Sequence, residues 1–293
     1  MKILLMAAAK VNLTLDILGK RPDGYHDLKS IMQSVGIYDK ITIEQNHSGK
    51  ITIACSREDV PCDQRNIVYK CAEAFYKKIG TKNEGLFINI EKDIPTQAGM
   101  GGGSADGAAV LVGLNEMCGR PLDEYELEKI GAAIGADIPF CVRGGTVLCE
   151  GIGDRLQTLE SIPMCWFAVV KPPVSVSTAK AYAAVDKEGF VSNYSTEKML
   201  ASLTNVGEIG ANLKNDFEDT LNIDEVVKIK NELLKCDGCL GAVMSGSGSA
   251  VFGIFENKEN AEKCTKSFCG RYSEVFTAEK SDFSVRICSL SDD

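Results

Sequence analysis

The stretch PTQAGMGGGSADGAA, residues 95–109, gathers five glycines between Gly99 and Gly107 and then continues as a helix-like run. Clustered glycines are tolerated mainly where the backbone reaches positive φ or lies close to another group. Apolar residues at helical spacing predict a helix with Ser104 as N-cap and an end near Gly119. A glycine loop that leads into a helix N-terminus offers unpaired N–H groups and a positive dipole end, so it is a candidate phosphate site.

Two familiar phosphate motifs do not fit this loop. A P-loop carries Lys-Ser or Lys-Thr after its last glycine, whereas no lysine lies between Lys92 and Lys129. The dinucleotide fingerprint requires a third glycine where this chain has Ser104. The glycines alone therefore leave phosphate binding and a plain linker equally open. If a nucleotide binds here, its cationic partner and any catalytic base come from elsewhere in the chain.

The segments on either side of the loop carry polar residues that could supply these groups. Lys10 directly precedes residues 11–17, whose apolar and polar side chains alternate and predict a strand with one buried face, ended by the turn GKRPDG. After the loop, Asp123 and Glu126 occupy the positions of a capping box, so a helix is expected to follow. That helix would deliver Asp137 to a loop just beyond its C-terminus. Taken alone, Lys10 is more simply a solvated lysine, and Asp137 is more simply a loop residue.

The rest of the chain mixes strands and helices, so an α+β fold is expected. The sequence changes character near residues 159–163, which predicts two domains, 1–159 and 160–293. A polar span that ends at Asp219 is expected to be rich in loops. The further expected elements are strands at 40–44, 50–54 and 86–91, helices at 66–79 and 224–235, a helix from 177, a strand pair at 144–159, a strand at 165–173 and a hairpin at 241–256.

Composition limits the class of protein. The net charge of −9 over 293 residues argues against a surface that wraps nucleic acid, and no apolar run approaches the roughly 20 residues of a membrane helix. The first ten residues barely meet the minimum for a signal peptide, so a cytoplasmic protein is expected. Because the cytoplasm is reducing, the 12 cysteines are expected to be free thiols rather than disulfides. Cys236 and Cys239 have the spacing of half a zinc site, but no matching second pair follows, which favours ordinary half-buried thiols.

Three separated segments together carry a resemblance to a known family. AAAKVNLTLDILGKRPDGYHDLKSI, PTQAGMGGGSADGAA and GAVMSGSGSAVFGIF resemble, in this order and spacing, the three motifs of the GHMP kinases, the superfamily of galactokinase, homoserine kinase and mevalonate kinase. The resemblance covers essentially the whole chain. It implies a two-domain α+β fold with a ribosomal-protein-S5-like, ATP-binding N-terminal domain and a ferredoxin-like, substrate-side C-terminal domain.

The resemblance also implies roles for individual residues. Lys10 and Asp137 match the family's catalytic pair, in which the aspartate takes the proton of the acceptor hydroxyl while the lysine keeps it ionised and oriented. The expected cofactors are ATP and Mg²⁺, with the metal ligands left open and Asp106 at a variable position. The residues that would wrap the ATP triphosphate are Pro95, Ala98, Gly99, Met100, Gly101, Gly102, Gly103, Ser104 and Ala105.

The first motif narrows the expected acceptor. GKRPDGYHDL after AKVNLTLDI resembles the GHMP kinases that phosphorylate the 2-hydroxyl of a cytidine diphosphate conjugate of methylerythritol, in non-mevalonate isoprenoid synthesis. Tyr25 and Tyr182 would stack on the two faces of the cytosine, and His26 would read its edge. The full set of expected substrate-binding residues is Asn12, Tyr25, His26, Tyr182, Ser245 and Gly246.

Several alternatives stay open. Tyr25, His26 and Tyr182 could instead be a half-buried tyrosine, a capping histidine and a core tyrosine. Another GHMP kinase, such as a homoserine or mevalonate kinase, is the alternative within the superfamily, and a nucleotide-binding protein without transfer activity is the alternative outside it. We expect a small-molecule substrate, no nucleic-acid or membrane partner, and a monomer or weak homodimer.

Overall fold

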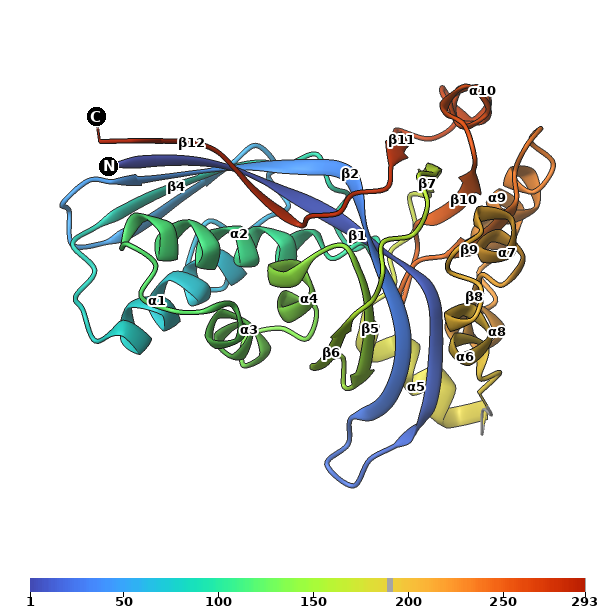
Figure 1. The fold of residues 1–293 in the computed structure, drawn as a ribbon, viewed down its shortest axis with the longest axis horizontal. Coiled ribbons are helices and arrows are strands. Elements are labelled where there is room, and N and C mark those ends of the chain that lie inside the picture. The colour runs from blue at the N-terminus through green and yellow to red at the C-terminus, as the bar shows by residue number, and fades with distance from the viewer. Residues whose placement is uncertain (189–191, 293) are drawn as a thin grey trace.

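The computed structural model describes residues 1–188 and 192–292, which form two sheets with helices packed on them (Figure 1). The larger sheet has the order β12-β1-β2-β4-β3, with β5 beside β2, β6 beside β5 and β8 beside β1. Its strands are β1 (Lys2–Lys20), β2 (His26–Gln45), β3 (Ile51–Cys55), β4 (Leu86–Glu91), β5 (Thr146–Gly151), β6 (Arg155–Thr158), β8 (Lys214–Asn215) and β12 (Val285–Ser291).

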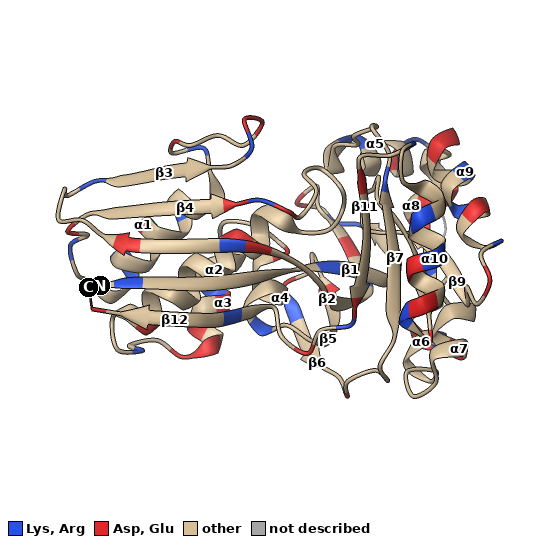
Figure 2. Ribbon diagram, turned by 90° about the horizontal axis from the view of Figure 1, so that it is seen from above, with Lys and Arg blue, Asp and Glu red and all other residues tan. Residues whose placement is uncertain are grey.

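One face of this sheet is covered by helices. Seen from above, β3, β4, β2, β1 and β12 lie side by side with helices beneath them (Figure 2). These helices are α1 (Ile67–Ile79), α2 (Gly102–Met117), α3 (Glu124–Ala132) and α4 (Ile138–Arg143).

The smaller sheet belongs to the second half of the chain and has the order β11-β7-β10-β9. Its strands are β7 (Trp166–Lys171), β9 (Gly241–Met244), β10 (Val251–Phe255) and β11 (Glu274–Glu279). The helices of this half are α5 (Thr178–Glu188), α6 (Ser195–Leu200), α7 (Val206–Ala211), α8 (Asp216–Leu221), α9 (Asp224–Leu233) and α10 (Lys258–Phe268).

Strand β1 connects the two hydrophobic cores. Its alternating apolar residues Val11 and Leu13 pack in the core of the larger sheet, whereas Leu15 and Ile17 pack in the core of the second half. The β1–β2 register shifts between residues 12 and 14, close to this change. The polar residues around position 12 therefore lie where the two cores meet.

The structure confirms most of the expected elements and corrects two expectations. The predicted strands, the helix at 66–79, the capping box of α3 and the antiparallel 241–255 hairpin are all present. The expected N-cap Ser104 is wrong, because Gly101 caps α2 and Ser104 lies in its first turn. The described part of the polar span also holds α6, α7 and α8 rather than loops alone. Helix α6 depends on a distant residue, since Asp16 of β1 accepts hydrogen bonds from the backbone of Ser195 and Thr196.

The last strand returns to the first half of the molecule. β12 pairs antiparallel with β1, from Lys2 opposite Ser291 to Ala7 opposite Val285. The first and the last strand therefore lie side by side in the larger sheet (Figure 1). The division at residue 159 stays a prediction, and this pairing adds that the final residues lie beside the first strand.

Candidate active site

The glycine loop lies directly against the third motif. Gly99 and Gly101 have φ of +74° and +70°, a region that residues with a side chain rarely adopt. A Cβ on Gly99 would lie 2.0 Å from the backbone oxygen of Ser245, and a Cβ on Gly101 would lie 3.0 Å from Cγ of Lys10. Glycine is therefore required here both by the backbone conformation and by the close approach of two other segments.

Hydrogen bonds tie the three motifs together at this point. The Ser245 hydroxyl donates to the Gly99 carbonyl (2.9 Å) and accepts from the backbone N–H of Asn12 (3.3 Å). The backbone N–H of Lys10 donates to the Met100 carbonyl at 3.0 Å. The structure therefore brings together the expected residues of all three segments.

Lys10 and Asp137 face each other beside this junction. The Lys10 ammonium lies 3.7 Å from Oδ2 of Asp137 and donates to Oδ1 of Asn12 at 2.6 Å. The Lys10 side chain is 3 % exposed, whereas that of Asp137 is 34 % exposed. The amide of Asn12 is fixed in turn by Ser30, whose hydroxyl accepts from Nδ2 at 2.8 Å. A buried cation thus holds a carboxylate that solvent and substrate can reach, which is the arrangement a general base requires.

Asp137 reaches this position through two short helices. It follows α3 and directly precedes α4, whose N-terminal residues are Ile138 and Pro139. Pro at the start of a helix is favourable because its missing N–H would have no intrahelical partner there.

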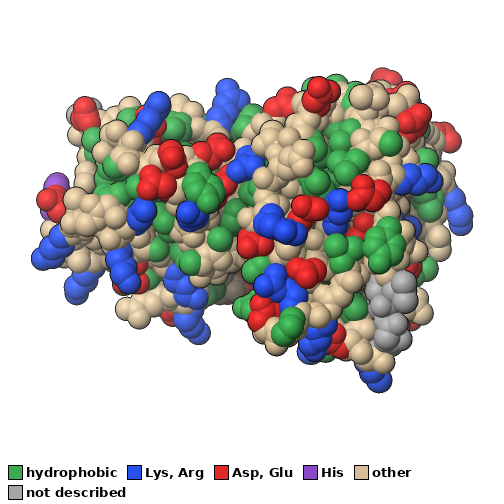
Figure 3. All heavy atoms as spheres, turned by 60° about the horizontal axis from the view of Figure 1, so that its bottom comes forward, with side chains coloured by type: hydrophobic (Ala, Val, Ile, Leu, Met, Phe, Trp, Pro, Cys, Tyr) green, Lys and Arg blue, Asp and Glu red, His purple; other side chains and the backbone are tan. Residues whose placement is uncertain are grey.

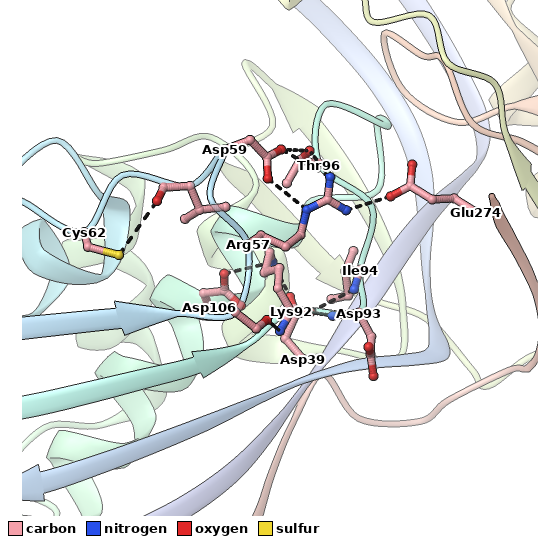
Figure 4. A network of polar contacts seen from close by, with 12 residues as sticks. Asp39, Arg57, Asp59, Cys62, Lys92, Asp93, Ile94, Thr96, Asp106 and Glu274 are labelled. Atoms are coloured by element: carbon pink, nitrogen blue, oxygen red, sulfur yellow. Dashed lines mark hydrogen bonds and ion pairs between the residues drawn. The ribbon is translucent and has the colours of Figure 1, made fainter.

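The sequence did not reveal a buried ion cluster beneath the glycine loop, shown in Figure 4. Lys92 forms ion pairs with Asp39 and, at 2.9 Å, with Oδ2 of Asp106. Oδ1 of Asp39 also accepts the backbone N–H groups of Asp93 and Ile94, at 2.7 and 2.8 Å. The cluster therefore joins β2 to the residues that enter the loop and to the first turns of α2.

Asp106 is an unusual member of this cluster. It is buried, and its Oδ1 has no hydrogen-bond partner among the described residues. Burial raises the pKa of Asp106 well above its ordinary value, and the nearby charge of Asp39 acts in the same direction. An aspartate in the otherwise apolar and glycine-rich start of α2 was the available sequence signal, but its partners lie too far away in the chain to be inferred.

A second ion cluster, next to the first in Figure 4, also contacts the loop. Arg57 donates to Oδ1 of Asp59 (2.9 Å), to Oε1 of Glu274 in β11 (2.7 Å) and to the hydroxyl of Thr96 in the glycine loop (3.3 Å) (Figure 4). The Arg57 hydrogen bond also lowers the pKa of the Asp59 carboxyl. The loop is therefore tied to the second half of the molecule as well as to its own domain.

The residues expected to bind a base lie at the β1–β2 turn and on α5. Tyr25 is 61 % exposed. The ring stacked on Tyr182 is that of His26, with a centroid distance of 4.5 Å and an interplanar angle of 14°, and Phe217 meets Tyr182 edge-on at 5.0 Å. Burial raises the pKa of Tyr182 to about 12. His26 itself therefore stacks on Tyr182, while Tyr25 leaves a large ring surface in solvent. The roles expected for these three residues in binding a base stay predictions.

Comparisons with known proteins agree with this arrangement of motifs. Sequence models of the GHMP kinases N terminal domain and the GHMP kinases C terminal region match residues 66–145 and 197–274. Together they cover more than half of the chain. The chain belongs to the GHMP kinase family.

Two similar relatives of this GHMP kinase have the same name, 4-diphosphocytidyl-2-C-methyl-D-erythritol kinase. The protein of that name from Caldicellulosiruptor saccharolyticus is 44 % identical, covering 89 % of this chain and 91 % of the relative. One from Clostridium botulinum (strain Alaska E43 / Type E3) is 41 % identical, covering 92 % of this chain and 97 % of the relative. The chain is thus similar to these kinases over nearly its whole length.

Solved structures place the GHMP kinase in the same fold. A crystal structure of 4-(cytidine 5'-diphospho)-2C-methyl-D-erythritol kinase matches with a TM-score of 0.78 and 29 % identity, covering 96 % of this chain and 99 % of the other. Homoserine kinase from Cytophaga hutchinsonii matches with a TM-score of 0.75 and 19 % identity, covering 98 % and 97 %, and supports the fold alone. The expected two-domain α+β GHMP kinase fold is confirmed. Within residues 1–188 and 192–292, no helix of this kinase has the length and apolar character to span a bilayer.

Proposed function

We propose that the protein transfers the γ-phosphoryl group of ATP to the 2-hydroxyl of 4-diphosphocytidyl-2-C-methyl-D-erythritol, a step of non-mevalonate isoprenoid synthesis. The main support for phosphoryl transfer is the ion pair beside the glycine loop, in which the Lys10 ammonium lies 3.7 Å from Oδ2 of Asp137. The choice of acceptor is supported by the name shared by relatives that are 41 and 44 % identical over about nine-tenths of this chain.

The pair can carry out the proton chemistry of this reaction. Phosphoryl transfer depends mainly on positioning and charge stabilisation, with a carboxylate to accept the proton of the attacking hydroxyl. Asp137 takes that proton as the hydroxyl oxygen bonds to the γ-phosphorus, and the bond to the β-phosphate oxygen breaks to release ADP. Lys10, held by Asn12, pairs with the carboxylate of Asp137 and stabilises negative charge on the attacking oxygen.

The proposed phosphoryl donor is ATP as its magnesium complex. The phosphates would lie at the glycine loop and the N-terminus of α2, where unpaired N–H groups favour anions. Ser104 is a partly exposed residue in the first turn of α2, and its hydroxyl would fit as a magnesium ligand, since P-loop NTPases use a Ser or Thr hydroxyl this way. When bound, the ion neutralises charge on the phosphates. Asp106 does not fit this role, because it is enclosed and paired with Lys92.

The proposed cytidine site consists of Tyr25, His26 and Tyr182. Base–aromatic stacking contributes about 1–3 kcal/mol per base in single-strand binders. The base is distant from the transferred group, so this energy is expected to act equally in the ground and transition states and to appear in KM. Ser245 and Gly246 of the third motif would contact the acceptor near the reacting hydroxyl.

The remaining proposals concern the type of substrate, the roles of the two halves of the chain, the location of the protein and its oligomeric state. On the face shown in Figure 3, acidic and basic side chains are interspersed, consistent with a small-molecule substrate. We propose that residues 1–159 bind ATP, that residues 160–293 contribute the acceptor side, and that the protein is a cytoplasmic monomer or weak homodimer.

The experiment that tests the proposal measures ATP consumption with the cytidine diphosphate conjugate, homoserine and mevalonate as separate acceptors. Turnover is expected with the first alone. In Asp137→Asn, which keeps the shape but cannot take the proton, kcat is expected to fall by about 10²–10⁴ while the KM for ATP changes little. Preference for homoserine or mevalonate, or retention of more than half of kcat, contradicts the proposal.

Tyr25→Ala tests the cytidine site separately. Loss of one stacking contact is expected to raise the acceptor KM by roughly 5- to 150-fold with little change in kcat, and Tyr25→Phe is the matched control that keeps the ring. CMP is expected to compete with the acceptor in the parent protein and to lose this ability in Tyr25→Ala. An unchanged acceptor KM contradicts the stacking role.

A further inference from the structure

We propose that Asp186 sets the tautomer of His26 and thereby makes the acceptor site select cytosine over uracil. The inference rests on the proposed function, and it adds a positioning residue that acts through His26. It begins from the contacts of the His26 ring, which is buried at the base of the β1–β2 turn, with its side chain 5 % exposed.

Helix α5 holds the His26 ring in two ways. Tyr182 and Asp186 are four residues apart and so lie on the same side of the helix. Tyr182 stacks on the ring, and Oδ1 of Asp186 lies 2.7 Å from its Nε2. Oδ2 of Asp186 accepts a hydrogen bond from the Lys20 ammonium at 2.6 Å. Both carboxylate oxygens are therefore engaged, one by the ring and one by a lysine.

These contacts decide which ring nitrogen carries the proton. An ionised carboxylate only accepts hydrogen bonds, so in the neutral imidazole form of His26 the proton lies on Nε2, the nitrogen that faces Asp186. The Lys20 hydrogen bond, followed by that of His26, lowers the pKa of Asp186 and keeps it ionised. Nδ1 of His26 is left as a hydrogen-bond acceptor.

The orientation of the ring gives this acceptor a partner in the base. The His26 and Tyr182 rings lie 4.5 Å apart and within 14° of parallel, so His26 covers part of the Tyr182 face and lies in the layer that a base stacked on the rest of that face would occupy. Two flat groups in one layer meet edge to edge. Cytosine presents an N4 amino donor to an acceptor such as Nδ1, whereas uracil presents a second acceptor, O4, at the same position. The tautomer fixed by Asp186 therefore favours cytosine.

Asp186→Asn is the decisive substitution, because Lys20 determines how the new amide is oriented. The ammonium only donates, so the amide oxygen is expected to face Lys20 and the amide NH₂ to face His26. Nε2 then becomes the acceptor and the proton moves to Nδ1. In the Lys20→Met/Asp186→Asn double variant the amide can turn its oxygen back to His26, and the parent tautomer is expected to return.

The experiment combines inhibition constants for CMP and UMP with ¹⁵N NMR of the histidine ring. The chain has 2 histidines, so His47→Gln assigns the His26 signals. We expect CMP to bind about 10- to 100-fold more tightly than UMP in the parent, the ratio to fall at least tenfold in Asp186→Asn, and the NMR signature to change from Nε2–H to Nδ1–H. The KM for ATP is expected to stay unchanged.

The controls separate this inference from the proposed function. Asp27→Asn, an adjacent carboxylate paired with Arg21, is expected to leave the CMP to UMP ratio and the tautomer unchanged. If CMP does not compete with the acceptor at all, the cytidine site itself is wrong. If CMP competes but Asp186→Asn changes neither the ratio nor the tautomer, the role of Asp186 is wrong. Asp186→Ala, which removes the acceptor without supplying a donor, is expected to give mixed tautomers and an intermediate ratio.

Discussion

Gly99→Ala tests the contact that joins the glycine loop to the third motif. Gly99 has φ of +74°, and a Cβ placed there would lie 2.0 Å from the Ser245 oxygen, roughly 1.4 Å short of an ordinary contact. Gly80, after α1, offers a matched control, since its φ is +71° and a Cβ would meet nothing within 4 Å. The two substitutions therefore share the backbone strain and differ in the steric overlap.

The expected losses of stability follow from this difference. A left-handed conformation costs a residue with a side chain about 1–2 kcal/mol, which is the full loss expected for Gly80→Ala. Overpacking adds about 1–3 kcal/mol, so Gly99→Ala is expected to lose about 2–5 kcal/mol. Urea denaturation of the two variants measures the free energy of unfolding directly.

The same overlap is expected to affect catalysis. To admit the added methyl group, the loop and the 241–255 hairpin must separate by about an ångström or more. Ser245 then moves away from the Asn12 backbone N–H that it binds, and Asn12 is the residue that holds the Lys10 ammonium. A misplacement of about 1 Å near a reacting group can lower the rate about 10²-fold. We expect that loss of kcat in Gly99→Ala, and a change of less than about twofold in Gly80→Ala. Equal losses of stability in the two variants, or an intact kcat in Gly99→Ala, would refute the reasoning.

Three further predictions concern buried groups. Because the pKa of Asp106 is higher in the folded protein than its ordinary value of 3.8, its contribution to the free energy of unfolding is fully present below about pH 3.8. This contribution is lost as the pH rises through the pKa of the folded state. The free energy of unfolding of Asp106→Asn is therefore expected to increase relative to that of the parent as the pH rises from about 4. Urea denaturation measures both values, and a difference between them that does not change with pH contradicts the prediction. Lys92→Met leaves two enclosed carboxylates without their cation and is expected to lose about 3–5 kcal/mol, whereas a loss below about 1 kcal/mol would show that the cluster matters little. Burial raises the pKa of Cys71 and of Cys165 to about 12, so these two thiols are expected to react with an alkylating reagent at pH 8 only after unfolding. Mass spectrometry of the labelled folded protein is expected to find the reagent on the exposed thiols, which are Cys62, Cys118, Cys269 and Cys288.

The sequence by itself determined the features that depend on residues close together in the chain. The capping box of Asp123 and Glu126 predicts the start of α3, and the alternating side chains after Lys10 predict β1. The hairpin at 241–255 follows from two apolar runs around a Gly/Ser turn. Each signal works because the interacting groups are neighbours, so their spacing is fixed by the helix or strand itself. The resemblance of three separated motifs added the family and the candidate pair Lys10 and Asp137.

The tertiary structure decided the features that depend on groups far apart in the chain. Helix α6 needs Asp16 of β1, and the loop needs the Asp39–Lys92–Asp106 cluster, none of which leaves a local pattern. The same holds for Asp186, which meets His26 across 160 residues of chain. Buried charges and histidine tautomers respond to whichever groups surround them, and only the path of the folded backbone brings those groups within hydrogen-bond distance.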